Sequence, residues 1–499
     1  MLELSGRPLT LDEIASVAHQ HQQVKLHPTA IGRIEAARKV VDDICESGTP
    51  TYGINTGFGR LSDVHVPPDQ LKALQLNLVR SHACGVGPLL SEAEVRAMML
   101  LRANVLAVGH SGIRVSVVET ILDMLNKGVH PVIPEKGSVG ASGDLAPLAH
   151  LALTVIGEAD AHFKGVRMRS SEAMAKAGIK PVELQAKEGL ALLNGTQAMG
   201  AVGALALHRA QRISLLADAA GACTLEALLG TPVAFDDRIH QCRPHPGQIA
   251  VAKHLRHLLA DSEIRESHRV GDPRVQDAYS LRCMPQVHGA VRGVFAHAKE
   301  IVEIESGSAT DNPLVFADAG DVLSGGNFHG APLAMAFDYC AIAMTDLMSI
   351  SERRIDRLVN PDLNEHLPPF LCAEPGISSG FMIAHVTAVS LLNEAKILSH
   401  PASTDNLPTS GGKEDHVSMG MVAARKFRII TDCAARVLAI ELMAATEGLE
   451  YRKPLKPGKG VQRIYDEVRK LVSRLEADRV LSGDIERLAE AINDGTIAA

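Results

Sequence analysis

Tryptophan is absent from the 499 residues of this chain, and all aromatic residues together make up only 3%. A chain of this length can bury a large core. That core must be aliphatic, because hydrophobic residues still reach 46%. The same figure excludes a disordered chain. A composition rich in Ala, Leu and Val favours closely packed helices, and few stretches alternate as strands do. We therefore predict a mainly α protein.

Basic residues are also fewer than acidic ones. The chain has 50 Lys and Arg against 58 Asp and Glu, a net charge of −8. Such a chain has no general attraction for nucleic acid or for anionic membranes. We find no run of about 18 residues free of charged or strongly polar groups, as a spanning helix requires. The first residues, MLELSGR, lack the basic and apolar parts of a signal peptide. These absences predict a cytoplasmic protein that binds neither nucleic acid nor membrane.

Cysteine pairs at redox spacing are missing too. The eight cysteines include no Cys-x-x-Cys, so we expect them to be reduced and to pack as small apolar residues. Cys242 and His245 have a spacing that occurs in zinc sites, but prolines flank His245. His254 and His257 also have a spacing that occurs in zinc sites, with cationic residues beside them. We predict no metal site.

What the chain does have is an unusual glycine-rich stretch at 137–150, GSVGASGDLAPLAH. Its glycines permit a tight or left-handed backbone. Asp144 is placed to cap the helix that follows, and Pro147 is tolerated in the first turn of that helix. The apolar run at 148–156 predicts that this helix is buried. We expect residues 141–143 to lie in a bent loop at a helix N-terminus.

Such a loop permits a covalent reaction of the backbone. When it is compressed, the Gly143 nitrogen can approach the Ala141 carbonyl carbon and close a five-membered ring, because glycine has no Cβ. Loss of water from the ring and from the Ser142 side chain would leave a methylidene group conjugated to two carbonyls. That group is a strong electrophile. The N-terminus of the next helix would stabilise negative charge on the ring oxygens.

Other interpretations of this loop start from the same residues. Small-residue loops at helix starts commonly bind phosphate or carboxylate. A serine amidohydrolase using Ser142 would need Gly-x-Ser-x-Gly, and Asp144 breaks that pattern. A nucleotide-binding phosphate loop would need Gly-Lys-Ser/Thr, which does not occur. A purely structural helical assembly is the remaining alternative, although no internal repeat supports it.

Helix signals recur along the chain. Three capping boxes, in which a Ser or Thr precedes a Glu by three residues, predict helix starts; they begin at Thr10, Ser91 and Ser116. Apolar periodicity predicts long helices over 290–305, 331–358, 378–398 and 417–449. Residues 190–232 are nearly all small or aliphatic, which is typical of a helix buried on every side, with Asn194 interrupting them.

These patterns divide the chain into three parts. We predict an N-terminal mixed helix-and-loop domain at 1–200 that carries the Ala-Ser-Gly loop, and a central long-helix bundle at 201–450. Residues 451–499 would form a linker and a C-terminal helix. Within the first part, 51–66 is an aperiodic loop that contains Tyr52. It is a candidate lid, although a plain surface loop would have the same composition.

Several segments together resemble the aromatic amino acid ammonia-lyase family, whose members form a methylidene-imidazolone ring from Ala-Ser-Gly. Besides the 137–150 stretch, they are YGINTGFG (52–59), NLVRSH (77–82), LLNGTQ (192–197), QDAYSLRCMPQVHG (276–289), DNPL (311–314), GNFHG (326–330) and EDHVSM (414–419). The resemblance covers nearly the whole chain. It implies a helix bundle of the ammonia-lyase/aspartase-like type, no dissociable cofactor, and a homotetramer whose sites combine several subunits.

The resemblance also implies roles for individual residues. Tyr52 matches the family's mobile-loop tyrosine, the usual candidate for the base that takes the β-proton of an amino acid substrate. Asn194 matches a residue that contacts the substrate's carboxylate or amine, and Phe328 matches a wall of the pocket. Besides residues 141–143 and Tyr52, we expect Tyr279 to act in catalysis.

A carboxylate clamp is expected near the middle of the chain. Gln276, Tyr279 and Arg282 are spaced by three, so on a helical turn they would share a face, and Pro285 would soon end that helix. Arg282 is suited to hold a carboxylate through two parallel hydrogen bonds. In the family the matching Arg pairs with the substrate carboxylate, while the matching Tyr and Gln line the pocket.

Substrate choice depends on two polar residues. His82 and Glu414 match the positions at which histidine-specific members place groups for the imidazole. A buried carboxylate facing a phenyl ring would be left unpaired, which is costly. The expected reaction is therefore deamination of L-histidine to trans-urocanate and ammonia. The alternative is a tyrosine or phenylalanine lyase or an aminomutase of the same family. Lys413 departs from the usual pattern and is placed to compete for Glu414.

Overall fold

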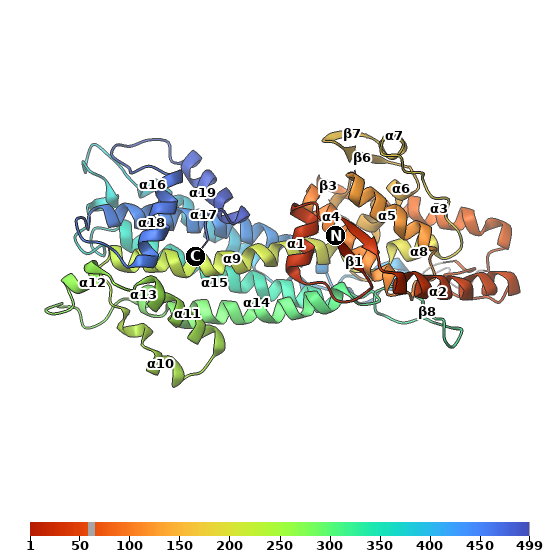
Figure 1. Cartoon of the computed structure of the whole chain (residues 1–499), viewed down its shortest axis with the longest axis horizontal. Coiled ribbons are helices and arrows are strands. Elements are labelled where there is room, and N and C mark those ends of the chain that lie inside the picture. Colours follow the sequence, from red (N-terminus) through yellow and green to blue (C-terminus); the bar gives the residue numbers. More distant parts are fainter. Residues whose placement is uncertain (58–64, 499) are drawn as a thin grey trace. The chain divides into compact units, whose positions relative to one another are not determined.

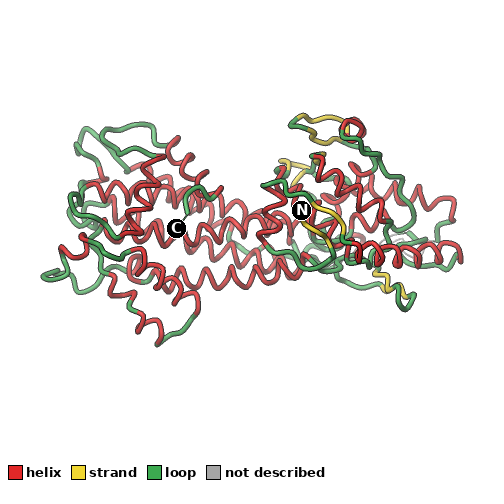
Figure 2. Tube along the Cα trace, in the orientation of Figure 1, coloured by secondary structure: helices red, strands yellow, loops and turns green. Residues whose placement is uncertain are grey.

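The computed structural model describes residues 1–57 and 65–498, and most of this trace is helical (Figures 1 and 2). The α-helices are α1 Leu11–His19, α2 Pro28–Ser47, α3 Leu71–His82, α4 Glu92–Ala107, α5 Val115–Lys127, α6 Leu145–Val155, α7 Ser170–Lys176, α8 Glu188–Leu193, α9 Gln197–Ala227, α10 Asp237–Gln241, α11 Pro246–Leu258, α12 Glu263–Ser267, α13 Tyr279–Arg282, α14 Met284–Ser306, α15 Ala331–Val359, α16 Met382–Leu398, α17 Gly420–Glu450, α18 Lys459–Leu471 and α19 Ser482–Asp494. The expected mainly α class is confirmed.

The strands are short and pair in small groups. They are β1 Leu2–Leu4, β2 Val24–Leu26, β3 Val86–Leu89, β4 Val129–Pro131, β5 Pro134–Lys136, β6 Asp160–Phe163, β7 Val166–Arg169, β8 Leu314–Phe316 and β9 Asp321–Leu323. β1 and β2 are parallel, with Leu2 opposite Val24. The other pairs, β3–β5, β4–β6–β7 and β8–β9, are antiparallel. β4 and β5 lead directly into the glycine-rich loop in extended form, as Pro131 and Pro134 predict.

The chain divides into two compact units that are not consecutive in sequence. The first unit contains Met1–His208, Ala298–Asp338 and Pro401–Arg425, and the second contains Arg209–His297, Tyr339–His400 and Lys426–Ala499. The division falls within α9, α14, α15 and α17. The three consecutive domains expected from the sequence stay a prediction.

Local sequence explains most helix boundaries. Thr10 and Ser91 form complete capping boxes with Glu13 and Glu94, as expected. The third expected cap is wrong: α5 begins at Val115, so Ser116 lies inside the helix, and its N-cap is Arg114 without a side-chain bond. The expected long helices all form, with boundaries shifted by a few residues.

α15 is the one helix of the described residues that is long and apolar enough to cross a membrane by composition alone. It carries Asp338 and Asp346, and 67% of its apolar window is buried inside the protein. Burial of this kind is typical of a core helix.

The cysteines do not all pack as expected. Each of the eight is a free thiol, and Cys223, Cys340, Cys372 and Cys433 are buried. The expectation of burial is wrong for Cys84 and Cys242, which are exposed. Both lie just after the end of a helix, α3 for Cys84 and α10 for Cys242, rather than within a helix interior. His254, which was weighed as a metal ligand, instead bonds Asp218 through Nδ1 at 2.9 Å.

Candidate active site

The glycine-rich loop of the first unit is sharply bent just before α6. Gly140 and Gly143 have φ angles of 67° and 78°, the left-handed region that glycine adopts without steric cost. A Cβ on Gly143 would lie 2.2 Å from the carbonyl oxygen of Gly195, so no other residue fits there. Residues 141–143 are therefore held as expected, in a compressed turn at a helix N-terminus.

Hydrogen bonds from distant segments hold this turn. The Asp144 amide donates to the Gly195 carbonyl at 2.7 Å, and the Met419 amide donates to the Val139 carbonyl at 2.8 Å. The Gly140 carbonyl accepts two bonds; they come from Ser418 Oγ at 2.9 Å and from the Gly330 amide at 3.2 Å. Three remote segments thus fix the conformation of the loop.

Asp144 does not cap α6 with its side chain, which corrects the expectation. Its carboxylate instead accepts bonds from Ser138 Oγ and from the Met199 amide, both at 2.7 Å. Burial raises the pKa of this carboxyl to about 6, against the lowering effect of these bonds. Asp144 thereby joins the loop to the start of α9. Pro147 lies in the first turn of α6, as expected.

A cavity of about 540 Å³ opens over the loop. All its lining residues belong to the first unit; they are Tyr52, Ala141, Ser142, Asn312, Ser324, Gly325, Phe328, His329, Ser410, Lys413, Glu414, Asp415 and His416. Five of the expected residues are therefore brought together here. The candidate lid at 51–66 also includes residues 58–64, which lie outside the described part of the chain.

Glu414 faces Ser142 across this cavity. Its Oε1 accepts a bond from Ser142 Oγ at 2.5 Å. Its Oε2 accepts bonds from Thr409 Oγ1 at 2.6 Å and from Ser410 Oγ at 2.9 Å. Burial raises the pKa of the carboxyl, but these three hydroxyls and the charge of His82 outweigh burial and lower it. Glu414 is thus held as an anion next to the serine.

Lys413 lines the cavity without forming an ion pair to Glu414 among the described residues. His82 is the last residue of α3, and its Nδ1 lies 2.8 Å from the Leu78 carbonyl. It does not line the cavity, although its charge acts on Glu414. The role of His82 toward a substrate stays a prediction.

Asn194 is buried directly behind the cavity wall. Its Nδ2 donates to the carbonyl of Asn312 at 2.9 Å, and Asn312 lines the cavity. Its own carbonyl accepts a bond from Arg102 at 2.5 Å. Within the described part of the chain, Asn194 Oδ1 has no hydrogen-bond partner. An acceptor of this kind suits an N–H donor such as a substrate ammonium group.

Gln276, Tyr279 and Arg282 belong to the second unit and do not line this cavity. Gln276 precedes the four-residue helix α13, so the expected three-residue helical face is wrong. Pro285 lies in the first turn of α14 rather than ending a helix, because proline is tolerated there. Tyr279 is 71% exposed, and the Arg282 guanidinium lies over its ring at 4.6 Å from the centroid.

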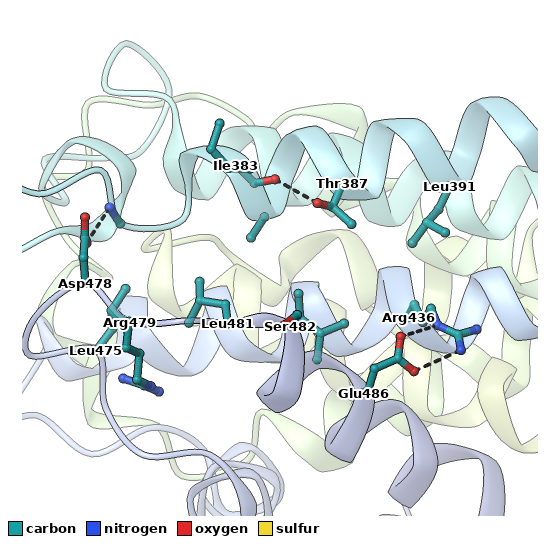
Figure 3. Close-up of a pocket in the computed structure, with 13 residues that line it drawn as sticks. Ile383, Thr387, Leu391, Arg436, Leu475, Asp478, Arg479, Leu481, Ser482 and Glu486 are labelled. Atoms are coloured by element: carbon teal, nitrogen blue, oxygen red, sulfur yellow. Dashed lines mark hydrogen bonds and ion pairs between the residues drawn. The ribbon is translucent and has the colours of Figure 1, made fainter.

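A second cavity, of about 530 Å³, lies in the second unit between α16, α17 and α19 (Figure 3). Apolar residues such as Ile383, Leu391 and Leu481 line it. Its charged groups already have partners: Arg436 is paired with Glu486, for example. It lacks the bent glycine-rich loop and the carboxylate fixed beside a serine, so the cavity over that loop is the candidate active site.

Several lining residues were not singled out from the sequence. Asn312, His329 and His416 lie inside the quoted motif segments, so the motifs carried a signal for them. Ser410, which lines the cavity, and Thr409, which bonds Glu414 from outside the lining, lie outside those segments. Only their contact with Glu414 in the folded chain reveals them.

Comparisons with known proteins identify the family of the chain. The chain matches the aromatic amino acid lyase family over residues 9–470. A histidine ammonia-lyase of Myxococcus xanthus is 54% identical over 99% of this chain and 97% of its own. The crystal structure of histidine ammonia-lyase from Trypanosoma cruzi is similar at 43% identity and a TM-score of 0.92, covering 99% of this chain and 94% of its own. A tyrosine aminomutase from Streptomyces globisporus is similar at 37% identity and 0.94, covering 99% and 97%. With its Ala-Ser-Gly turn, its cavity and these full-length relatives, the chain belongs to the aromatic amino acid lyase family.

Proposed function

We propose that this enzyme, a carbon–nitrogen lyase, deaminates L-histidine to trans-urocanate and ammonia. The contact between Ser142 and Glu414 is the single observation that carries the proposal, because it places a fixed carboxylate beside the reactive turn. The histidine ammonia-lyases that match the full length at about half identity support it.

The turn fits the prosthetic group of the family. Residues Ala141, Ser142 and Gly143 have the required order, and the approach of Gly195 leaves no room for a side chain at 143. When formed, the methylidene-imidazolone ring supplies an electrophile that captures the substrate. The N-terminus of α6 faces the same turn, and its partial positive charge favours negative charge there.

Ring formation would also prepare Glu414. The ring forms with loss of the Ser142 hydroxyl, which is the donor to Glu414 Oε1. Oε2 would keep its bonds from Thr409 and Ser410, so the carboxylate would stay in place with Oε1 open to the cavity. An imidazole N–H can fill that vacancy, whereas a phenyl ring cannot. This is the physical basis for the choice of histidine.

Proton removal is assigned to Tyr52, which lines the same cavity. A phenol acts as a base at neutral pH only when its pKa falls well below about 10. Asn194, with Oδ1 open, is assigned to the substrate ammonium group, and Phe328 to the wall beside the ring.

A second copy of the chain is proposed to complete the site. Arg282, the assigned carboxylate clamp, does not line the cavity of its own chain, whereas the neighbouring Tyr279 is largely exposed. Exposed apolar side chains also lie on α16 of the second unit; they are Ile383, Val386, Val389 and Ile397. A row of this kind is typical of an interface. We propose a homotetramer in which Gln276, Tyr279 and Arg282 enter the cavity of a neighbouring copy.

The proposed location is the cytoplasm, which fits eight free thiols. The function is tested by ammonia release from histidine, tyrosine and phenylalanine, assayed side by side on the purified enzyme. A preference for histidine supports the proposal. A preference for tyrosine or phenylalanine, or conversion to a β-amino acid, would assign the chain to another branch of the family.

A further inference from the structure

Two fully buried cations share a single carboxylate behind the wall of the active-site cavity. Lys187 Nζ lies 2.9 Å from Asp311 Oδ2, and neither side chain is exposed. Arg102 is buried as well, and among the described residues its guanidinium donates to neutral acceptors; they are the carbonyls of Ala191 and Asn194 and Oε1 of Gln197. The contact with the Asp311 carboxylate favours the protonated form of Lys187, and with Lys187 protonated the cluster carries one excess positive charge.

Among the described residues of the first unit, three other buried carboxyls have partners of their own. Glu188, next to Lys187, bonds Arg114 through both oxygens at 2.7 Å. Glu305 accepts a bond from Thr196, and Asp144 accepts a bond from Ser138 Oγ. Burial lowers the pKa of Lys187 and that of Arg102, the latter to about 10, while the charge of Asp311 opposes this. Arg102 is therefore still a cation at neutral pH.

The cluster is bonded directly to the cavity wall. Asp311 Oδ1 accepts a bond from the Asn312 amide at 2.6 Å, and Arg102 donates to the Asn194 carbonyl. Asn312 in turn accepts the bond from Asn194 Nδ2, and its Oδ1 accepts the Gly325 amide at 2.8 Å. Both asparagines are thus fixed by the buried charges.

The loop of Tyr52 packs against the same wall. A Cβ on Gly53 would lie 2.7 Å from Pro313 Cδ and 2.8 Å from Leu190 Cδ2. Pro313 follows Asn312, and Leu190 is three residues from Lys187. Tyr52 and Asn312 both line the cavity, and the two side chains that Gly53 approaches, Pro313 and Leu190, are apolar. A charge acts more strongly through an apolar medium than through water.

We propose that Lys187, Arg102 and Asp311 are positioning residues that hold Asn194 and Asn312 and leave one positive charge behind the cavity wall, where it favours the ionised form of Tyr52. The inference rests on the proposed function, because it assigns Tyr52 as the base. The other titratable groups on the cavity are His329, Lys413, Glu414, Asp415 and His416. They are the same in every variant below, so differences between variants report the cluster alone.

The test varies the charge of the cluster while keeping its hydrogen bonds. In Lys187→Gln an amide can still donate to Asp311, but the net charge of the cluster falls from one to zero. The acid limb of the kcat/KM profile with histidine should move up by about one pH unit. The double variant Lys187→Gln with Asp311→Asn restores a net charge of one, so its limb should return toward that of the wild type.

A second variant and a mass measurement complete the test. Arg102→Gln also lowers the net charge of the cluster by one, so it should move the acid limb in the same direction. It replaces Lys187→Gln as the test if that variant does not fold. The intact mass of each variant must still be two waters lower than the sequence requires, so that loss of the ring does not imitate the effect. If activity falls equally at every pH, or if the double variant is no nearer to the wild type than Lys187→Gln, the cluster is purely structural and the inference is wrong. A wild type without activity on histidine would instead overturn the proposed function.

Discussion

Ser142 Oγ and Glu414 Oε1 lie 2.5 Å apart, although 272 residues separate them in the chain. The serine belongs to the glycine-rich loop, and the glutamate follows a turn that supplies two more hydroxyl donors. In the proposed mechanism, the same carboxylate contacts the turn before ring formation and is freed toward the cavity by it. The proposal thus links reaction and substrate choice through this one pair.

Ser142→Ala should fold normally and lose nearly all activity, because without the hydroxyl no methylidene can form. The wild-type chain should be lighter than its sequence by two waters in an intact-mass measurement. Borohydride should inactivate the wild type and have no further effect on the variant. Full activity in Ser142→Ala would contradict the electrophile assignment and would equally exclude Ser142 as a nucleophile.

Gly143→Ala should abolish ring formation, because its Cβ would meet the Gly195 carbonyl at 2.2 Å. Gly165→Ala is a matched control: Gly165 has a φ of 77° against 78° for Gly143, and nothing lies within 4 Å of its Cβ position. The control should cost about 1–2 kcal/mol of stability and keep the ring. Intact mass and ammonia release measure both. Equal behaviour of the two variants would mean that the approach of Gly195 is unimportant.

Glu414→Ala should lower turnover of histidine about 10- to 100-fold, because an unpaired imidazole N–H costs about 1–3 kcal/mol. Weak activity on tyrosine or phenylalanine should suffer less or rise. Lys413→Ala is the neighbouring control; it should retain the preference, since Lys413 does not pair with Glu414 among the described residues. The side-by-side ammonia assay measures the activity of both variants on all three substrates. An equal loss on all three would indicate that Glu414 acts in ring formation instead of substrate choice.

Arg282→Lys should reduce kcat/KM markedly with the fold intact, because lysine keeps the charge but loses the two-point contact. Arg265→Lys is the comparison, since Arg265 also lies in the second unit but outside the motif segments. Histamine, which lacks a carboxylate, should be a poor substrate of the wild type. Wild-type behaviour of Arg282→Lys would move the clamp elsewhere.

Mixing two inactive variants tests whether two copies of the chain share a site. Chains carrying Ser142→Ala and chains carrying Arg282→Ala should each be nearly inactive alone. When they are unfolded and refolded together, some sites would combine an intact loop with an intact Arg282, and activity should return in part. Mixtures that stay as inactive as their components would place both residues in one copy's site, against the proposed assembly.

The stability of the fold should depend on pH through Asp144. Burial raises its pKa from 3.8 to about 6, so between these values the folded chain holds more protons than the unfolded one. The free energy of unfolding must then fall as pH rises through this window, by about 3 kcal/mol in all. Asp144→Asn should lose this component. Denaturant unfolding at a series of pH values measures it, and parallel curves for both proteins would show that Asp144 is not the group responsible.

Local patterns were enough for many of the helices. The boxes at Thr10 and Ser91 mark helix starts because side chain and backbone satisfy each other within four residues. The same pattern at Ser116 misleads, since Arg114 already has the extended backbone of an N-cap. Sequence alone cannot distinguish a box at a helix start from the same letters one residue inside.

The reactive turn was predictable for the same reason: glycine, a small residue and a helix start are all local. Contacts between segments were not. Thr409 and Ser410 look like ordinary turn residues until Glu414 is seen against them, and Lys187 looks like a surface lysine although its side chain is fully buried. The proposed roles of Gln276, Tyr279 and Arg282 would depend on a neighbouring copy, which no pattern within one chain locates.

The dependence of the glycine-rich turn on Gly195, Gly330 and Ser418 has a consequence for how the enzyme matures. A chain still emerging from the ribosome cannot complete these bonds until residues beyond 418 have been synthesised and the first unit has closed. On the proposed mechanism, a newly made or misfolded copy would carry an ordinary, unreactive peptide at 141–143. The electrophile would form last, and only where the folded chain already surrounds it with a cavity.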